Sequence, residues 1–167
     1  MTEYEAHRLK VAVDTPFAEF RRRYEAAVPE IDYDAVDALV NKHADWSEVV
    51  GLMDEWAPYG FLRYWSSDDG PLLRLAGDPG ECVNYLMGNH VIAERMYRHD
   101  QDVMMYAPLR PVIASRDEGT HFTIEQPSAI FASFGDPNVA EVGVELDRKV
   151  ATLLNHLDAP VPPALAR

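Results

Sequence analysis

The sequence contains very little cysteine. Its single cysteine, Cys82, cannot form a disulfide within the chain, and no Cys-x-x-Cys pair is present to bind zinc or to carry out dithiol chemistry. A lone thiol is either a small buried side chain or a nucleophile, and free cysteine is most often buried. The sequence therefore predicts no disulfide framework, and we interpret Cys82 as a core residue.

Basic residues are also scarce. The chain has 15 Lys and Arg residues against 28 Asp and Glu residues, which gives a formal net charge of −13. A surface with this charge repels phosphate backbones and anionic lipid headgroups. We therefore expect neither nucleic acid nor a membrane surface as a partner.

Long hydrophobic runs are missing, although 47% of the residues are hydrophobic. A membrane-spanning helix needs about 20 consecutive apolar residues, and no stretch comes near that length. The first residues, MTEYEAHRLK, contain no apolar segment typical of a signal peptide. These absences predict a soluble acidic protein, and we expect it in the cytoplasm.

Several signatures of catalysis and cofactor binding are absent. The chain contains no GxGxxG, GxxxxGK[ST], GxSxG or HExxH motif, so the usual marks of nucleotide folds, α/β-hydrolases and zinc proteases are missing. The six histidines are scattered. Met104 and Met105 are adjacent and would face opposite sides of a strand, which favours core packing over haem or copper binding. We expect no metal and no cofactor.

Alternation and helical spacing predict the elements that are present. Leu9, Val11 and Val13 share one face of a strand, whereas the apolar residues after Asp136-Pro137 recur at helical spacing behind a capping residue. We expect strands over 4–13, 61–65, 72–77, 82–88, 111–115 and 121–125. We expect helices over 16–28, over 34–55 in two pieces, over 89–98 and over 137–157.

This order of elements predicts an α+β fold. Runs of hairpin strands with a long final helix are typical of an antiparallel sheet with helices packed on one face, rather than of a doubly wound parallel sheet. The length favours a single domain over residues 1–157. We expect residues 32–59 to be a helical insertion in that domain and residues 158–167 to be a Pro-rich C-terminal tail.

A known family is similar to the second half of the chain. The segments YLMGN, APLRPVIASRDEG and FGDP, followed by the final helix, resemble the domain of unknown function 302 family over roughly residues 60–155. That family has a strand ending in Gly-Asn, then a helix, then a Leu-Pro-Leu-Arg-like strand and an Asp-x-x-Gly-like turn. The resemblance implies a TATA-binding-protein-like fold and a small homodimer whose biochemical role is generally unassigned.

The chain departs from the family's pattern at two positions. His90 stands where the family tends to have proline after Gly-Asn, and Ala107 stands where it tends to have leucine. A histidine at a helix start is favoured in its neutral form by the helix dipole and can act as a base. The segment from Asp32 to Tyr59 is longer than the family's usual linker, and its Trp46, Trp56 and Tyr59 are candidates to wall a pocket.

The stretch MGNHVIAERMYRHD carries the best candidate site. Asn89 is expected to cap a helix in which His90 and Glu94 lie on one side, so the carboxylate has the spacing to orient the imidazole for acid-base catalysis. The alternative is a solvated helix face in which Glu94 pairs with Arg98. His99 falls on the apolar side, where a structural histidine competes with a ligand-binding one.

Asp100, Tyr106 and Arg110 form the second part of this candidate site. Arg110 has the geometry either to clamp a substrate carboxylate or to pair with Asp100. Tyr106 either supplies a hydroxyl to the site or packs in the core with its hydroxyl satisfied.

Two functions fit these residues. The first is a small-organic-molecule-binding protein whose cavity has aromatic walls, with Arg110 as its polar anchor and Asn89, Glu94 and Asp100 beside it. The walls would be Trp56, Tyr64, Trp65 and Tyr85. The second is a cofactor-independent enzyme, such as an isomerase, lyase or cyclase, in which His90 or His99 is the base and Tyr106 with Arg110 stabilises an oxyanion. A purely structural dimer would have no pocket at all.

Overall fold

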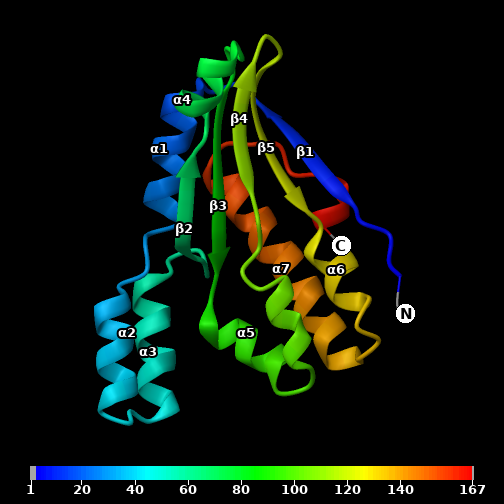
Figure 1. The fold of residues 1–167 in the computed structure, drawn as a ribbon. Coiled ribbons are helices and arrows are strands. Elements are labelled where there is room, and N and C mark those ends of the chain that lie inside the picture. Colours follow the sequence, from blue (N-terminus) through cyan, green and yellow to red (C-terminus); the bar gives the residue numbers. More distant parts are fainter. Residues whose placement is uncertain (1–2, 167) are drawn as a thin grey trace.

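The computed structural model describes residues 3–166, and its centre is a five-stranded sheet (Figure 1). All neighbouring strands are antiparallel, in the order β1-β5-β4-β3-β2. The strands are β1 (Arg8–Val13), β2 (Leu62–Asp68), β3 (Glu81–Gly88), β4 (Val112–Arg116) and β5 (Gly119–Glu125).

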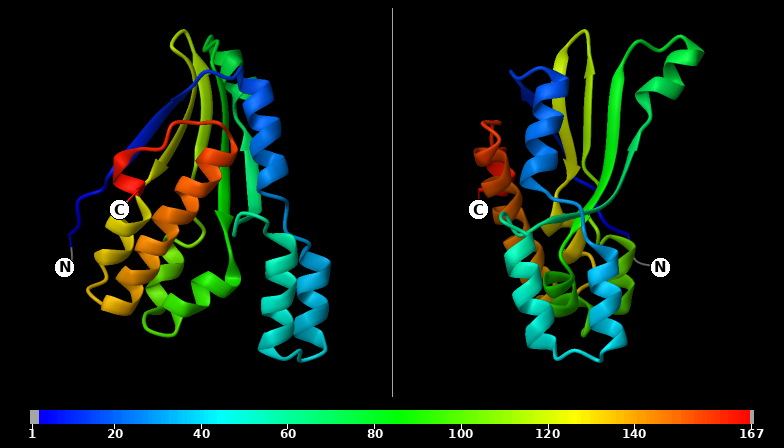
Figure 2. Two further views of the ribbon diagram at one scale, coloured as in Figure 1. Left: turned by 180° about the vertical axis from the view of Figure 1, so that it is seen from behind. Right: turned by 90° about the vertical axis from the view of Figure 1, so that its left-hand side faces the viewer.

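Two long helices cover one face of this sheet. Helices α1 (Phe17–Ala27) and α7 (Pro137–His156) lie on the same side, which the two views of Figure 2 make plain. The other helical elements are α2 (Tyr33–Asn41), α3 (Trp46–Trp56), α4 (Gly70–Leu73), η1 (Arg74–Ala76), α5 (His90–Tyr97), η2 (Gln101–Met105), α6 (Pro127–Ala132) and η3 (Pro163–Leu165). The predicted α+β fold with an antiparallel sheet is confirmed, and its likeness to the TATA-binding protein stays a prediction.

The main core lies between the sheet and these two helices. Val11 and Val13 of β1 are buried with Phe122 and Ile124 of β5, because alternate residues of a strand share one face. Helix α7 buries a stripe at three- and four-residue spacing against them. The stripe consists of Val139, Val142, Leu146, Val150 and Leu153.

Helix α5 is fixed at its first residue. The Asn89 side chain accepts a hydrogen bond from the Val91 backbone nitrogen at 2.9 Å, which satisfies one of the free N–H groups of the first turn. Its Nδ2 also donates to the carbonyl oxygen of Gly60 at 3.3 Å. Asn89 therefore joins the start of α5 to the segment that leads into β2, and so places His90.

Helices α2 and α3 form a hairpin beside α5. Asp32 caps α2, and Asp45 with Glu48 forms a capping box on α3. The hairpin joins the body through a small buried cluster, whereas α2 itself buries no side chain. The cluster consists of Ile31, Met53, Ala57 and Leu62. The apolar side of α2 is therefore left without a complete cover.

Two local predictions are wrong. Residues 72–77 are not the return strand of a hairpin, because Gly70 and Pro71 open the short helix α4, and β2 instead runs on to Asp68 and pairs with β3. The Met104-Met105 pair lies in η2 and not on a strand. Both methionines are exposed, at 45% and 66%, so they are not core residues.

Candidate functional site

An apolar groove opens between the α2–α3 hairpin and α5. Its volume is about 550 Å³. The lining comes from α2, the turn after it, α3, α5 and η2, and it is mostly aliphatic. The lining residues are Val36, Leu39, Val40, His43, Ala44, Trp46, Val49, Met53, His90, Ala93, Glu94, Tyr97 and Met104.

A hydrogen-bonded pair of Tyr64 and His90 lies beside this groove. The Tyr64 hydroxyl and the His90 Nδ1 are 3.0 Å apart, and the two rings meet edge to face with centroids 5.0 Å apart. Of the residues from 3 to 166, only Tyr64 makes a side-chain hydrogen bond with this imidazole. The pair joins strand β2 to helix α5 across 26 positions of sequence.

A β-bulge explains why Tyr64 reaches His90. Arg63 pairs with Met87 and Trp65 pairs with Leu86, so Tyr64 is the extra residue between them. A bulge of this kind turns a side chain away from the regular alternation of the strand. Gly88 leaves room for the Tyr64 ring, because a Cβ at Gly88 would lie 3.3 Å from the ring carbon Cε2.

Burial determines the protonation of this pair. It lowers the pKa of His90 below the ordinary value of 6.5, because the imidazolium would lose its hydration. Burial also raises the pKa of Tyr64 well above its ordinary value of 10, with a further contribution from Tyr33. At neutral pH the pair is therefore a neutral imidazole and a protonated phenol.

The two tautomers of the pair offer different chemistry. When the phenol donates to Nδ1, the imidazole proton is on Nε2, which is then a hydrogen-bond donor. When Nδ1 carries the proton and donates to the phenol oxygen, Nε2 has a free lone pair and is a base. The first tautomer suits recognition of an acceptor group, and the second suits proton abstraction.

A smaller pocket lies on the inner side of the same helix. It has a volume of about 130 Å³ and shares His90, Ala93 and Met104 with the groove. Tyr64 and Asn89 line this inner pocket. His90 therefore stands between two adjoining spaces, one open and apolar and one small.

Glu94 lies on the groove but does not contact His90. Its carboxylate is bound by Arg98, whose Nη2 is 2.7 Å from Oε1 and 2.6 Å from Oε2. The structure thus shows the Glu94–Arg98 pair of the solvated-face alternative, and Tyr64 rather than Glu94 orients the imidazole. Tyr64 was predicted as a wall and not as this partner.

The other residues expected in an enzyme site lie apart from His90. Tyr106 and Asp100 line a separate cavity of about 730 Å³ beside η2 and α6. Arg110 is exposed and donates to the carbonyl oxygen of Met105 at 2.8 Å, while Asp100 caps η2. The His99 Nδ1 lies 3.9 Å from the Asp136 Oδ2.

The remaining aromatic residues are spread over the molecule. Tyr85 is buried in the main core, where its hydroxyl donates to Glu25 at 3.0 Å. Trp56 packs against the small cluster of the hairpin, and Trp65 is 50% exposed on β2. Of the three aromatic residues of the long segment that were expected to wall a pocket, Trp46 lines the groove, whereas Trp56 and Tyr59 do not.

Sequence reasoning missed the aliphatic part of the groove. Val36, Leu39 and Val40 recur at helical spacing, which indicates a buried stripe, but nothing in the sequence says that the stripe faces an open space.

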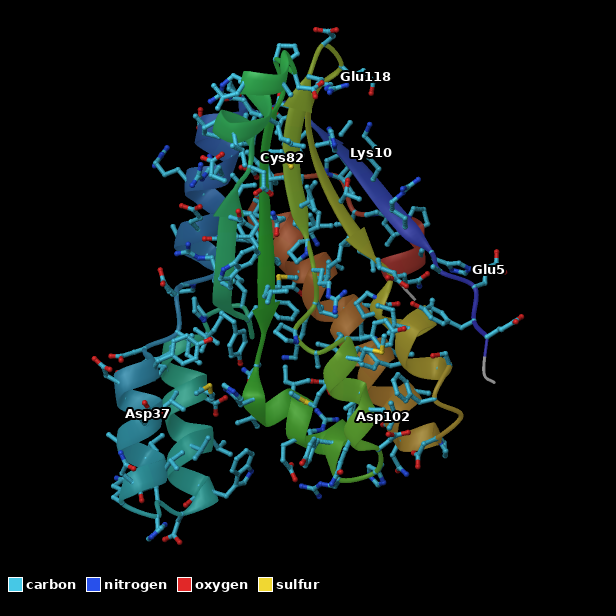
Figure 3. All side chains as sticks on the ribbon, viewed as in Figure 1. Glu5, Lys10, Asp37, Cys82, Asp102 and Glu118 are labelled. Atoms are coloured by element: carbon cyan, nitrogen blue, oxygen red, sulfur yellow. The ribbon has the colours of Figure 1, made fainter. Side chains whose placement is uncertain are left out.

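Thiol, metal and membrane features add little to the site. Cys82 is partly buried on β3, distant from the hairpin in Figure 3, and burial with nearby Asp69 raises its pKa, which disfavours the thiolate. Within residues 3–166, no group of three or more His, Cys, Asp or Glu side chains is arranged to hold a metal ion. Over the same residues no helix has the length and apolarity to span a membrane.

Comparisons with known proteins give one family and one fold. Residues 75–157 match the family described as "Domain of unknown function DUF302". The chain is similar to a solved structure, "Crystal structure of uncharacterized conserved protein DUF302 from Bacillus stearothermophilus", with 16% identity and a TM-score of 0.62. The match covers 91% of this chain and 97% of that one, and at this identity it establishes the fold alone. No curated protein matches the sequence.

Proposed function

The chain belongs to the DUF302 family through residues 75–157, and because that family's description assigns no activity, we propose a function from the site: binding of a small apolar organic molecule in the groove of α2, α3 and α5. The family resemblance expected from the sequence is thereby confirmed. The observation that carries the proposal is an open aliphatic groove lined by His90, whose uncharged imidazole is hydrogen-bonded to Tyr64 beside the groove.

The size and chemistry of the groove support a small ligand. A volume of about 550 Å³ falls within the range of sites that bury a drug-sized molecule. Aliphatic and aromatic side chains supply the area that an apolar ligand can cover. His90 supplies one directional contact, because its Nε2 is left free by the bond between Nδ1 and Tyr64.

Two measurements test this proposal: the affinity for a neutral probe, and the loss of that affinity when a large side chain is placed in the groove. We choose 2-naphthylethanol as a neutral probe and expect calorimetry to give a Kd on the order of 10–1000 μM, since good small ligands gain about 0.3–1.5 kcal/mol per heavy atom. Ala93→Trp places a large ring where Ala93 lines both spaces, and should weaken binding at least about tenfold.

The matched control is Ala132→Trp, at an exposed alanine of helix α6 that does not line the groove. It should leave the affinity unchanged. Absence of binding to the natural sequence, or equal affinities of the two tryptophan variants, would contradict the proposal.

The Tyr64–His90 pair favours a second candidate, a cofactor-independent isomerase, lyase or cyclase. Burial keeps His90 neutral at pH 7, and a neutral imidazole near a ligand is the chemical form that a general base requires. In such an enzyme His90→Ala would abolish turnover and largely preserve affinity. In a binding protein the same variant would change only affinity, so the two measurements separate the candidates.

A further inference from the structure

The groove has a negative charge among its lining residues but no Lys or Arg. Glu94 is the one Asp, Glu, Lys or Arg among the lining residues. Its side chain is 30% exposed, whereas its partner Arg98 is 58% exposed and does not line the groove. A ligand in the groove therefore meets the carboxylate at closer range than the guanidinium.

The hairpin around the groove is also acidic. Residues 32–56 include a single Lys or Arg, Lys42, and this lysine is held by Glu48 at 2.5 Å. Seven acidic residues stand in the same stretch, one of which, Asp37, is marked on α2 in Figure 3. They are Asp32, Asp34, Asp37, Asp45, Glu48, Asp54 and Glu55.

We propose that the occupant of the groove is an apolar amine, with a hydrophobic body against α2 and α3 and a protonated amino group near Glu94. The inference rests on the proposed function and specifies its ligand. An ammonium near the hairpin is attracted by the summed negative potential, while a carboxylate or phosphate group is repelled.

The same charges disfavour the other occupants of an apolar groove. A second copy of this chain that placed its own hairpin here would bring two acidic surfaces together. An anionic amphiphile would find no Lys or Arg among the lining residues, and burial lowers the pKa of His90, which disfavours its charged form. The negative charge of Glu94 therefore favours a ligand whose head group is a protonated amine.

Three naphthalene probes that differ in the charge of their head group test which charge the groove prefers. We would measure the affinities of 2-(2-naphthyl)ethylamine, 2-naphthylethanol and 2-naphthylacetate by calorimetry at about 20 mM and 300 mM salt. At low salt the amine should bind about fivefold more tightly than the alcohol, and the carboxylate more weakly than either. High salt should reduce the differences, because the charges near the groove are partly exposed.

Glu94→Gln should remove most of the preference for the amine and leave the affinity of the alcohol within about twofold. Glu145→Gln is the matched control, since Glu145 also binds an arginine, Arg95 at 2.6 Å, but lies outside the groove. Equal or tighter binding of the carboxylate would overturn the inference, and so would an amine preference that survives in Glu94→Gln. If the alcohol does not bind, the proposed function itself fails.

Discussion

His90 is a histidine whose properties come from two neighbours in space. Tyr64 occupies its Nδ1, and partial burial beside α3 and β2 disfavours the charged ring. Both effects depend on the bulge in β2 that directs Tyr64 toward the helix and on Gly88, which leaves space for the phenol ring. A change at Tyr64 or Gly88 should therefore alter the chemistry of the imidazole.

The lowered pKa of His90 predicts a pH dependence of stability. The unfolded chain takes up a proton on this residue as the pH falls through about 6.5, whereas the folded chain resists it. The unfolded state then binds more protons, so the free energy of unfolding should fall with decreasing pH. This penalty is absent above about pH 7.5 and grows as the pH falls through 6.5 toward the folded value.

Urea unfolding at pH 7.5 and 5.5 measures this effect. His90→Gln should lose less stability between the two values than the natural sequence does. The control is His156→Gln, at a histidine that is also bonded to a tyrosine, Tyr59 at 2.7 Å, but lies at the end of α7. Equal losses in the natural sequence and in His90→Gln would refute the assignment.

At the residue scale the sequence singled out His90 as a candidate but did not indicate its partner Tyr64. His90 stood out because it breaks a familiar Gly-Asn pattern at a helix start. Its bond to Tyr64 spans 26 positions and depends on a bulge, which no local pattern indicates. The same bulge fixes the outward position of Trp65, since one added residue reverses the faces of a strand.

Helix α5 is the element on which the site depends. It carries His90, Ala93 and Glu94 into the groove, and its other side contacts α7 and the core through Ile92 and Met96. Its N-terminus is held by Asn89, which both caps the helix and bonds to Gly60. The Asn89 side chain therefore contributes both to the stability of α5 and to the position of the groove residues that α5 carries.

Asn89→Ala should lower the free energy of unfolding by about 1–2 kcal/mol, because it removes a helix cap and a second hydrogen bond. It should also weaken the binding of 2-naphthylethanol, since the first turn of α5 loses its anchor. Urea denaturation and calorimetry measure the two effects.

Asn138→Ala is the control, because Asn138 is exposed in the first turn of α7 and its side chain bonds to Asp136 alone among the described residues. Its effect on both quantities should be smaller. An Asn89→Ala variant that keeps full stability and full affinity would contradict the anchoring role.

Elements with a strong periodic signal were predictable, and short ones were not. The start of α7 at Asp136-Pro137 and the two helices of the hairpin follow directly from caps and spacing. Helix α6 has six residues and α4 has four, which is too short for a helical period to appear. The leucines of residues 72–75 resemble a strand, and Gly70-Pro71 decides otherwise.

At the scale of the whole molecule, the sheet and its two long helices form a body from which the α2–α3 hairpin extends (Figure 1). The body contains the main core, while the hairpin packs through its own small cluster. Helices α2 and α3 lie in residues 32–59, and the interpretation of this segment as an insertion stays a prediction, as does the homodimer implied by the family resemblance. The acidic hairpin is poorly suited to contact a second copy of itself.

The most direct test of the central claim is a methyl NMR titration of the chain with 2-naphthylethanol. We predict saturable shifts of the groove methyl groups of Val36, Leu39, Val49 and Met104, with no comparable shifts at Leu72 and Leu75 on the exposed segment α4–η1. Shifts confined to other surfaces, or an absence of saturable shifts anywhere, would contradict a ligand-binding groove between the hairpin and α5.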